Sequence, residues 1–123
     1  MLVATLSGVA LALPASATIR TQSTEISCDA VTIKNGISVT HYGGNYSIKQ
    51  NSTAPRSTTK VWATSQNGND LPMRMAIDGE TKTWSALAGS YTVKALRAAE
   101  ANCNGVLPGH GNYTWNYTVT FNG

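Results

Sequence analysis

The stretch from Asn112 to Asn122 constrains the fold of this chain more than any other. Large apolar and small polar residues alternate along it without interruption. The large residues are Tyr113, Trp115, Tyr117, Val119 and Phe121. Because side chains of a strand point alternately to opposite faces, this pattern predicts a C-terminal β-strand with one buried face. A second layer of structure must cover that face.

The bulk composition agrees with a small all-β protein. The chain has 123 residues, enough for one domain, and 12% of them are charged, which is low for a cytosolic enzyme. Its net charge of +3 is small and dispersed, so we expect no nucleic-acid partner and no binding to an anionic membrane. We therefore predict a single-domain antiparallel β-sandwich, immunoglobulin-like in general architecture, over residues 18–123.

The N-terminus indicates export. Residues 2–13 are mostly apolar and uncharged, and Pro14-Ala15-Ser16-Ala17 follows with the Ala-x-Ala pattern of a signal-peptidase site. The apolar run is too short to span a membrane. We predict a secretory signal over residues 1–17 and a secreted, extracellular protein. The usual positive segment at the start of a signal is missing, and the alternative is a buried N-terminal strand or helix.

Two cysteines, Cys28 and Cys103, lie in the exported part. An even pair in a secreted chain favours a disulfide, and a bridge over so long a loop contributes on the order of 4 kcal/mol. A free thiol pair or metal ligands are the alternatives, although the spacing is unlike that of a zinc site.

The remaining strands follow from apolar periodicity and turn residues. Residues 18–25 are polar and predict a frayed lead-in. Lys34-Asn35-Gly36 predicts a three-residue hairpin loop that pairs Ile33 with Ile37, and Gly43-Gly44 should end the strand that follows. Strands are expected around 26–33, 37–41, 46–48, 59–65, 71–77, 90–97 and 112–122.

The strand over 71–77 is expected to bury one face. Leu71, Met73, Met75 and Ile77 alternate along it. Asp78-Gly79 then predicts a hairpin. A two-residue loop there would place Met73 opposite Trp84, whereas a three-residue loop would turn Leu87 inward, and the sequence does not decide between them.

The segment Leu87 to Val93 resembles the corner that enters a late strand of immunoglobulin-like sandwiches. The resemblance implies that the hydroxyl of Tyr91 bonds back to the preceding corner. It covers seven residues only. Antibody domains have a Cys two positions after that Tyr, where this chain has Val93, so the resemblance does not extend to the antibody family.

No pattern in the sequence indicates catalysis or a cofactor. Only His41 and His110 could act as a base, and neither lies in a nucleophile motif. His41 shares an apolar face and is interpreted as a core residue. Met73 and Met75 could hold Cu(I) through their thioethers, but their alternation favours core packing. We predict neither an enzyme nor a metal site.

The candidate binding residues are Trp62, Tyr42, Lys60 and His110. Lys60 and Trp62 should face outward from their strand, and Tyr42 lies beside two glycines. Exposed aromatic residues can anchor a protein or stack on a sugar ring, so we expect an extracellular protein or glycan partner. A loop covering Trp62 is the alternative.

A second hypothesis for the function is a secreted effector, such as a bacteriocin, toxin or protease inhibitor. Small size, export and a mild basic charge agree with such a protein. An inhibitor would present a rigid loop, for which residues 103–111, including His110, are the candidate.

Overall fold

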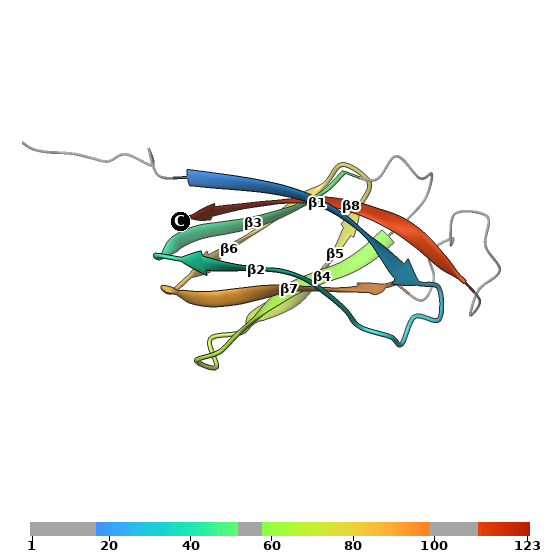
Figure 1. Ribbon diagram of the computed structural model, residues 1–123, viewed down its shortest axis with the longest axis horizontal. Helices are drawn as coiled ribbons and strands as arrows, with labels where there is room; N and C mark the ends of the chain where they lie inside the picture. The colour runs from blue at the N-terminus through green and yellow to red at the C-terminus, as the bar shows by residue number, and fades with distance from the viewer. Residues whose placement is uncertain (1–16, 52–57, 99–110) are drawn as a thin grey trace, which may run out of the picture.

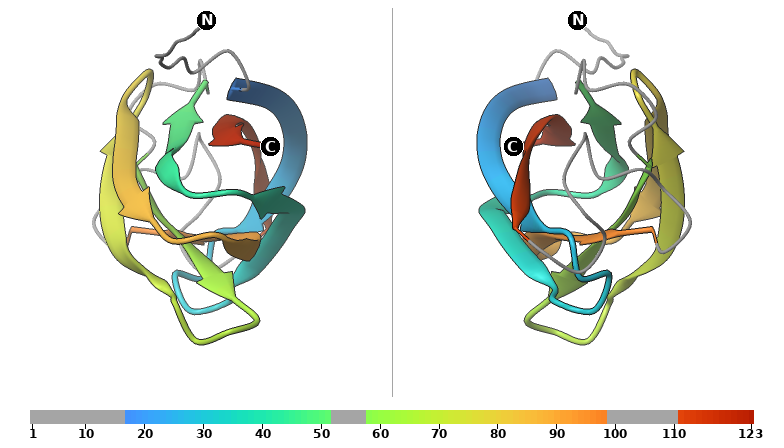
Figure 2. Two further views of the ribbon diagram at one scale, coloured as in Figure 1. Left: turned by 90° about the vertical axis from the view of Figure 1, so that its left-hand side faces the viewer. Right: turned by 90° about the vertical axis from the view of Figure 1, so that its right-hand side faces the viewer.

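The computed structural model describes residues 17–51, 58–98 and 111–123 (Figure 1). These residues form eight strands and no helix. The strands are β1 (Ala17–Ser27), β2 (Lys34–His41), β3 (Gly44–Gln50), β4 (Thr58–Ser65), β5 (Leu71–Ile77), β6 (Thr81–Ala86), β7 (Gly89–Arg97) and β8 (Asn112–Asn122). Two antiparallel sheets of four strands result, with the orders β1-β8-β3-β6 and β2-β7-β4-β5. The predicted all-β, two-sheet architecture is confirmed, and Figure 2 shows the sheets on opposite sides of the interior.

The strand order differs from that of immunoglobulin domains. Those domains keep several successive strands side by side in one sheet. Of the eight strands here, only β4 and β5 follow each other in the chain and also pair, and every other connection between described strands crosses to the opposite sheet. This is the connectivity of an eight-stranded jelly roll built from two Greek keys. The resemblance at the corner before Tyr91 is therefore local.

The C-terminal strand lies at the centre of its sheet, as its alternation predicts. β8 pairs along its length with β1 and over four residues with β3. All five of its large apolar side chains are buried, and Trp115 stacks on Tyr117 with ring centroids 4.2 Å apart. The aromatic face of β8 forms much of the core between the two sheets.

The prediction of a frayed lead-in before residue 26 is wrong. β1 pairs with β8 from Ala17 to Ser27. It is the edge strand of its sheet, and only Ile26 among its side chains is fully buried. An edge strand needs little apolar periodicity, because one neighbour supplies its backbone hydrogen bonds while its side chains remain in solvent.

The predicted strand over 26–33 and the hairpin at Lys34-Gly36 are also wrong. Asp29 turns the chain, because its Oδ1 accepts hydrogen bonds from the backbone N–H groups of Val31 (2.9 Å) and Thr32 (2.8 Å). These hydrogen bonds lower the pKa of Asp29 to about 2, and the bond from the Thr32 hydroxyl contributes most, ahead of the two N–H groups. Val31 and Ile33 are left exposed.

Residues 34–36 lie within β2, which pairs with β7 through a shift of register between Asn35 and Ser38. At this irregularity the Ile37 N–H donates to the Tyr117 hydroxyl at 3.0 Å. A Cβ on Gly36 would lie 2.5 Å from that hydroxyl oxygen. The glycine is therefore required by close approach to β8, not by a hairpin turn.

Only Leu71 of the four predicted inward residues on 71–77 is buried. Met73, Met75 and Ile77 are 47%, 50% and 59% exposed, while Ala76 is fully buried. The face changes along the strand because β5 pairs with β4 through a register shift between Val61 and Ala63.

Asp78-Gly79 does not close a β-hairpin, so both loop alternatives are wrong. β5 pairs with β4 and β6 pairs with β3, and the turn carries the chain from one sheet to the other. Trp84 is buried, and its Nε1 donates to the Pro72 carbonyl at 2.8 Å. Leu87 is 68% exposed.

The corner expected from the resemblance before Tyr91 is present. The Tyr91 hydroxyl donates to the Leu87 carbonyl oxygen at 2.7 Å. Tyr91, Val93 and Ala95 are buried along β7, as their alternation predicts.

Two further predictions fall outside the described residues. Residues 1–16, which hold most of the predicted signal, are not described. Cys103 lies in the segment 99–110, which is not described either, so the pairing of Cys28 with Cys103 stays a prediction. Cys28 itself is fully buried.

Gly36→Ala tests the approach of β2 to β8. The added methyl group would overlap the Tyr117 hydroxyl, so we expect a loss of about 1–3 kcal/mol in the free energy of unfolding. Urea denaturation measures this loss. Gly89→Ala is the matched control, since its Cβ would meet nothing closer than 3.6 Å. Equal stability of the two variants would contradict this packing.

Candidate binding face

The histidine inside the described fold is a core residue, as the sequence predicts. His41 is fully buried, with its Nε2 3.1 Å from the Gly44 carbonyl oxygen. Its Nδ1 accepts a hydrogen bond from the Asn122 N–H at 3.1 Å, which assigns the ring proton to Nε2. Both nitrogens are used, so this ring is not available as a base or a metal ligand.

Burial disfavours ionisation of the core tyrosines. Desolvation raises the pKa of Tyr46, Tyr91, Tyr113 and Tyr117 above the ordinary value. The hydroxyl of Tyr113 is also held by Thr59 at 3.0 Å. The described residues contain no group of three or more His, Cys, Asp or Glu side chains placed to hold a metal ion.

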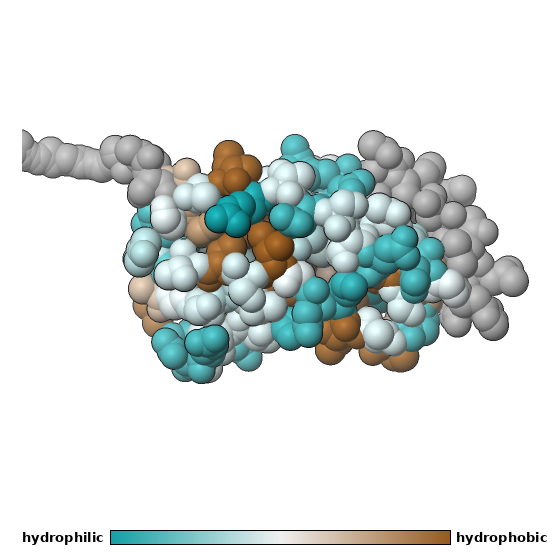
Figure 3. All heavy atoms as spheres, in the orientation of Figure 1, coloured by the Kyte–Doolittle hydropathy of each residue, from teal (hydrophilic) through white to brown (hydrophobic). Residues whose placement is uncertain are grey.

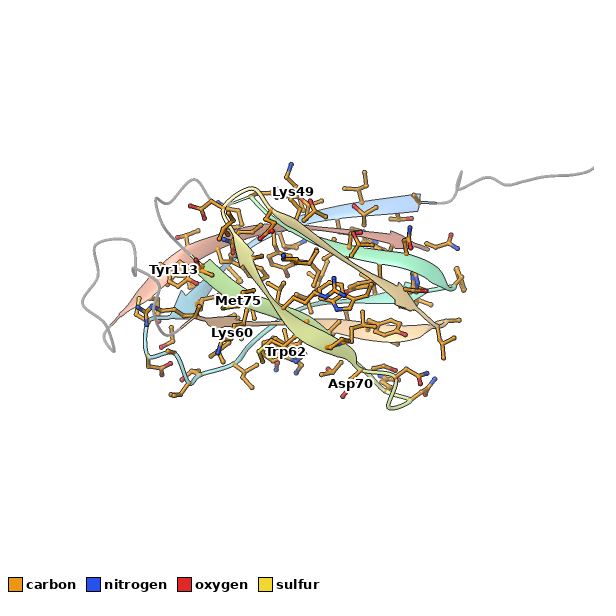
Figure 4. The ribbon with its side chains drawn as sticks, turned by 180° about the vertical axis from the view of Figure 1, so that it is seen from behind. Lys49, Lys60, Trp62, Asp70, Met75 and Tyr113 are labelled. Atoms are coloured by element: carbon orange, nitrogen blue, oxygen red, sulfur yellow. The ribbon has the colours of Figure 1, made fainter. Side chains whose placement is uncertain are left out.

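Lys60 and Trp62 lie on the outer side of β4, because the alternate residues Val61 and Ala63 are fully buried. Both side chains are partly exposed. The register places Met75 of β5 opposite Lys60. Figure 4 shows Lys60, Trp62 and Met75 on the same side of this sheet, away from Lys49.

We define the β4–β5 face as Lys60, Trp62, Met73, Met75 and Ile77. Its three β5 side chains are all about half exposed and follow one another on alternate positions. Other exposed apolar side chains are distributed over the surface, and Figure 3 shows apolar groups separated by polar ones on the side that it presents. The three exposed apolar side chains of β5 follow one another on the strand that pairs with β4.

Two basic side chains lie in or next to the β4–β5 face. Lys60 belongs to the face, and Lys94 of β7 lies opposite Trp62 in the register. The Lys94 ammonium donates to Asn35 Oδ1 at 2.5 Å, so its position is fixed by a neutral partner. The apolar surface is thus combined with positive charge.

The four sequence-predicted binding residues do not form one site. Tyr42 follows the end of β2, at the opposite edge of the sheet from β5. It is 69% exposed and lines a separate groove with Arg20 of β1. His110, and the candidate inhibitor loop except Gly111, lie outside the described residues. The structure brings together Lys60 and Trp62 only.

Sequence reasoning missed Met73, Met75 and Ile77 as surface residues. Their alternation with Leu71 is indistinguishable from that of a buried strand face. The one available signal was Pro72, which restricts a strand to an edge position. Pro72 correctly indicates that β5 is an edge strand, but it does not indicate which of its side chains point outward.

No protein-family model matches this chain, and no curated protein matches its sequence. Three solved structures are similar at a distance. The Yersinia pseudotuberculosis-derived mitogen has 13% identity and a TM-score of 0.47, over 84% of this chain and 83% of that chain. The SPBc2 prophage-derived protein YomS has 12% identity and a TM-score of 0.40, over 84% and 95%. A chain of the glycosylation-associated Gap123 complex of Streptococcus agalactiae has 10% identity and a TM-score of 0.38, over 88% and 40%.

These likenesses are too distant to assign a family or a function. Among the described residues there is also no helix with the length and apolar character needed to cross a membrane.

Proposed function

We propose that this chain is a small exported module without catalytic activity that binds an extracellular protein through the β4–β5 face. The observation that carries the proposal is the exposure of Met73, Met75 and Ile77 on β5, which pairs with the strand that holds Trp62. Removing such apolar side chains from water contributes about 25 cal/mol for each Å² buried. A protein surface with its own apolar side chains fits this face.

The residue types favour a protein over a glycan. Methionine side chains are flexible and polarisable, so they adapt to an irregular apolar partner surface. Tryptophan is enriched among the residues that dominate binding energy at protein interfaces. A sugar would require several polar groups beside the aromatic ring, whereas the β5 part of this face is apolar.

Lys60 and Lys94 suggest the charge of the partner. Basic groups around an apolar centre favour an approaching surface with acidic groups at its rim. Such rim charges mainly raise the rate of association, and their effect weakens as salt screens them.

The proposal is tested by removing the apolar centre of the face. Affinity capture from the extracellular fraction of the native host identifies the partner, and its dissociation constant is then measured with Trp62→Ala and Met75→Ala. We expect Trp62→Ala to weaken binding about thirtyfold, the effect of losing a central interface tryptophan. Lys49→Ala, on the outer side of the other sheet, is the matched control. Unchanged binding by Trp62→Ala, or an equal loss in the control, would contradict the proposed face.

Export and a Cys28–Cys103 disulfide are part of the same proposal. The Cys28 N–H donates to the Gly111 carbonyl at 3.0 Å, which places Cys28 beside the residue where the segment containing Cys103 returns to β8. A fully buried Cys28 at that point supports the pairing.

Intact mass spectrometry of the protein secreted by its host tests both points. We expect a chain that begins at Thr18 and gains the mass of two hydrogen atoms on reduction. A full-length chain with free thiols would overturn both export and the disulfide.

A further inference from the structure

A groove lies between the two sheets along the strands β5 and β6. Each is the edge strand of its own sheet, and the groove between them has a volume of about 450 Å³. Leu71, Trp84 and Ala86 contribute buried apolar side chains to its lining, and Leu87 contributes an exposed one. The groove is separate from the outer β4–β5 face.

Within the described part of the chain, the edge of β6 in this groove has open backbone groups. The Glu80 carbonyl accepts from the Gln50 N–H at 3.0 Å, so Glu80 and every second residue after it face β3. The backbone groups of Thr81, Thr83 and Ser85 therefore point away from β3. The Thr83 carbonyl confirms this direction, because it accepts from Arg74 Nη1 across the groove at 3.1 Å.

Along the edge of β5, by contrast, several backbone groups are missing or already have hydrogen-bond partners. Pro72 has no N–H, and its carbonyl accepts from Trp84 Nε1. The Ala76 carbonyl accepts from Gln50 Nε2 at 3.2 Å. A strand from another chain would find its backbone partners along β6, not along β5.

Arg74 supplies a fixed positive charge in the groove. Its guanidinium carbon lies 5.5 Å from the centre of the Trp84 ring, and Nη1 is held by the Thr83 carbonyl. In the described part of the chain, no acidic side chain forms an ion pair with it. The two contacts orient the guanidinium and leave its other N–H groups available for a carboxylate, which a planar fork binds well.

We propose that an extended acidic peptide segment of a partner protein adds to the edge of β6 and places a carboxylate on Arg74. The peptide backbone would pair with the Thr83 N–H and with both backbone groups of Ser85, and an adjacent side chain would lie against the exposed Leu87. Main-chain pairing supplies affinity and the guanidinium supplies selectivity for an acidic side chain. This second site does not depend on the β4–β5 face.

Two acetylated and amidated peptides, Thr-Val-Glu-Val-Thr and Thr-Val-Gln-Val-Thr, test the proposal on the wild-type protein. Titration followed by ¹⁵N–¹H NMR should shift the amide signals of Thr83 and Ser85. We expect the Glu peptide to bind about fivefold tighter than the Gln peptide, as a charge-assisted hydrogen bond would produce. Equal affinities, or shifts confined to other strands, would overturn the proposal.

Two variants separate this site from the β4–β5 face. Arg74→Gln should remove the difference between the two peptides, and Trp62→Ala should leave it unchanged. A difference that persists in Arg74→Gln would overturn the role of Arg74. If that variant does not fold, the comparison of the two peptides on the wild-type protein still decides the proposal.

Discussion

The buried side chain of Gln50 joins the two sheets through hydrogen bonds at both ends of its amide. Its Oε1 accepts from Trp115 Nε1 at 2.9 Å, and its Nε2 donates to the Ala76 carbonyl and to Asp78 Oδ1, each at 3.2 Å. One amide thus connects the central strand β8 with the end of β5 in the opposite sheet. A buried amide without these partners would cost several kcal/mol, so the geometry around it is strongly specified.

The same residue explains why the chain crosses between sheets at Asp78-Gly79. The Gln50 backbone bonds to Gly79 within that turn and to Glu80 directly after it. The Ala76 carbonyl accepts from Gln50, the Ala76 side chain packs into the core, and its neighbours Met75 and Ile77 are exposed. The exposed part of β5 thus coincides with the bond from Gln50 to the Ala76 carbonyl and with the register shift between β4 and β5.

Local patterns predicted a large part of the fold. The alternation in β4, β7 and β8 identified their buried faces, and a seven-residue resemblance identified the Tyr91 corner. Two of the failures involve a side chain that bonds to distant or neighbouring backbone. Asp29 ends a strand that its apolar neighbours predicted, and Gln50 bonds to the Ala76 carbonyl at the end of β5. Such bonds leave no periodic signal in the sequence.

The candidate site was predicted only in part. Lys60 and Trp62 were placed correctly, because their strand has regular alternation on both sides of the shift. Tyr42 was correctly expected to be exposed, but it lies at the other edge of its sheet. The distance between two residues on different strands depends on the order of the strands within the sheet. Apolar periodicity alone does not reveal that order, here the jelly-roll connectivity.

Limited oxidation by hydrogen peroxide tests the exposure of the β5 methionines most directly. Thioethers at the surface oxidise in the folded protein, whereas those in a close-packed core are protected until unfolding. Peptide mapping of the native protein should show Met73 and Met75 converted to sulfoxide at rates close to those in denaturant. Protection of both residues in the native state would place them in the core and contradict the β4–β5 face.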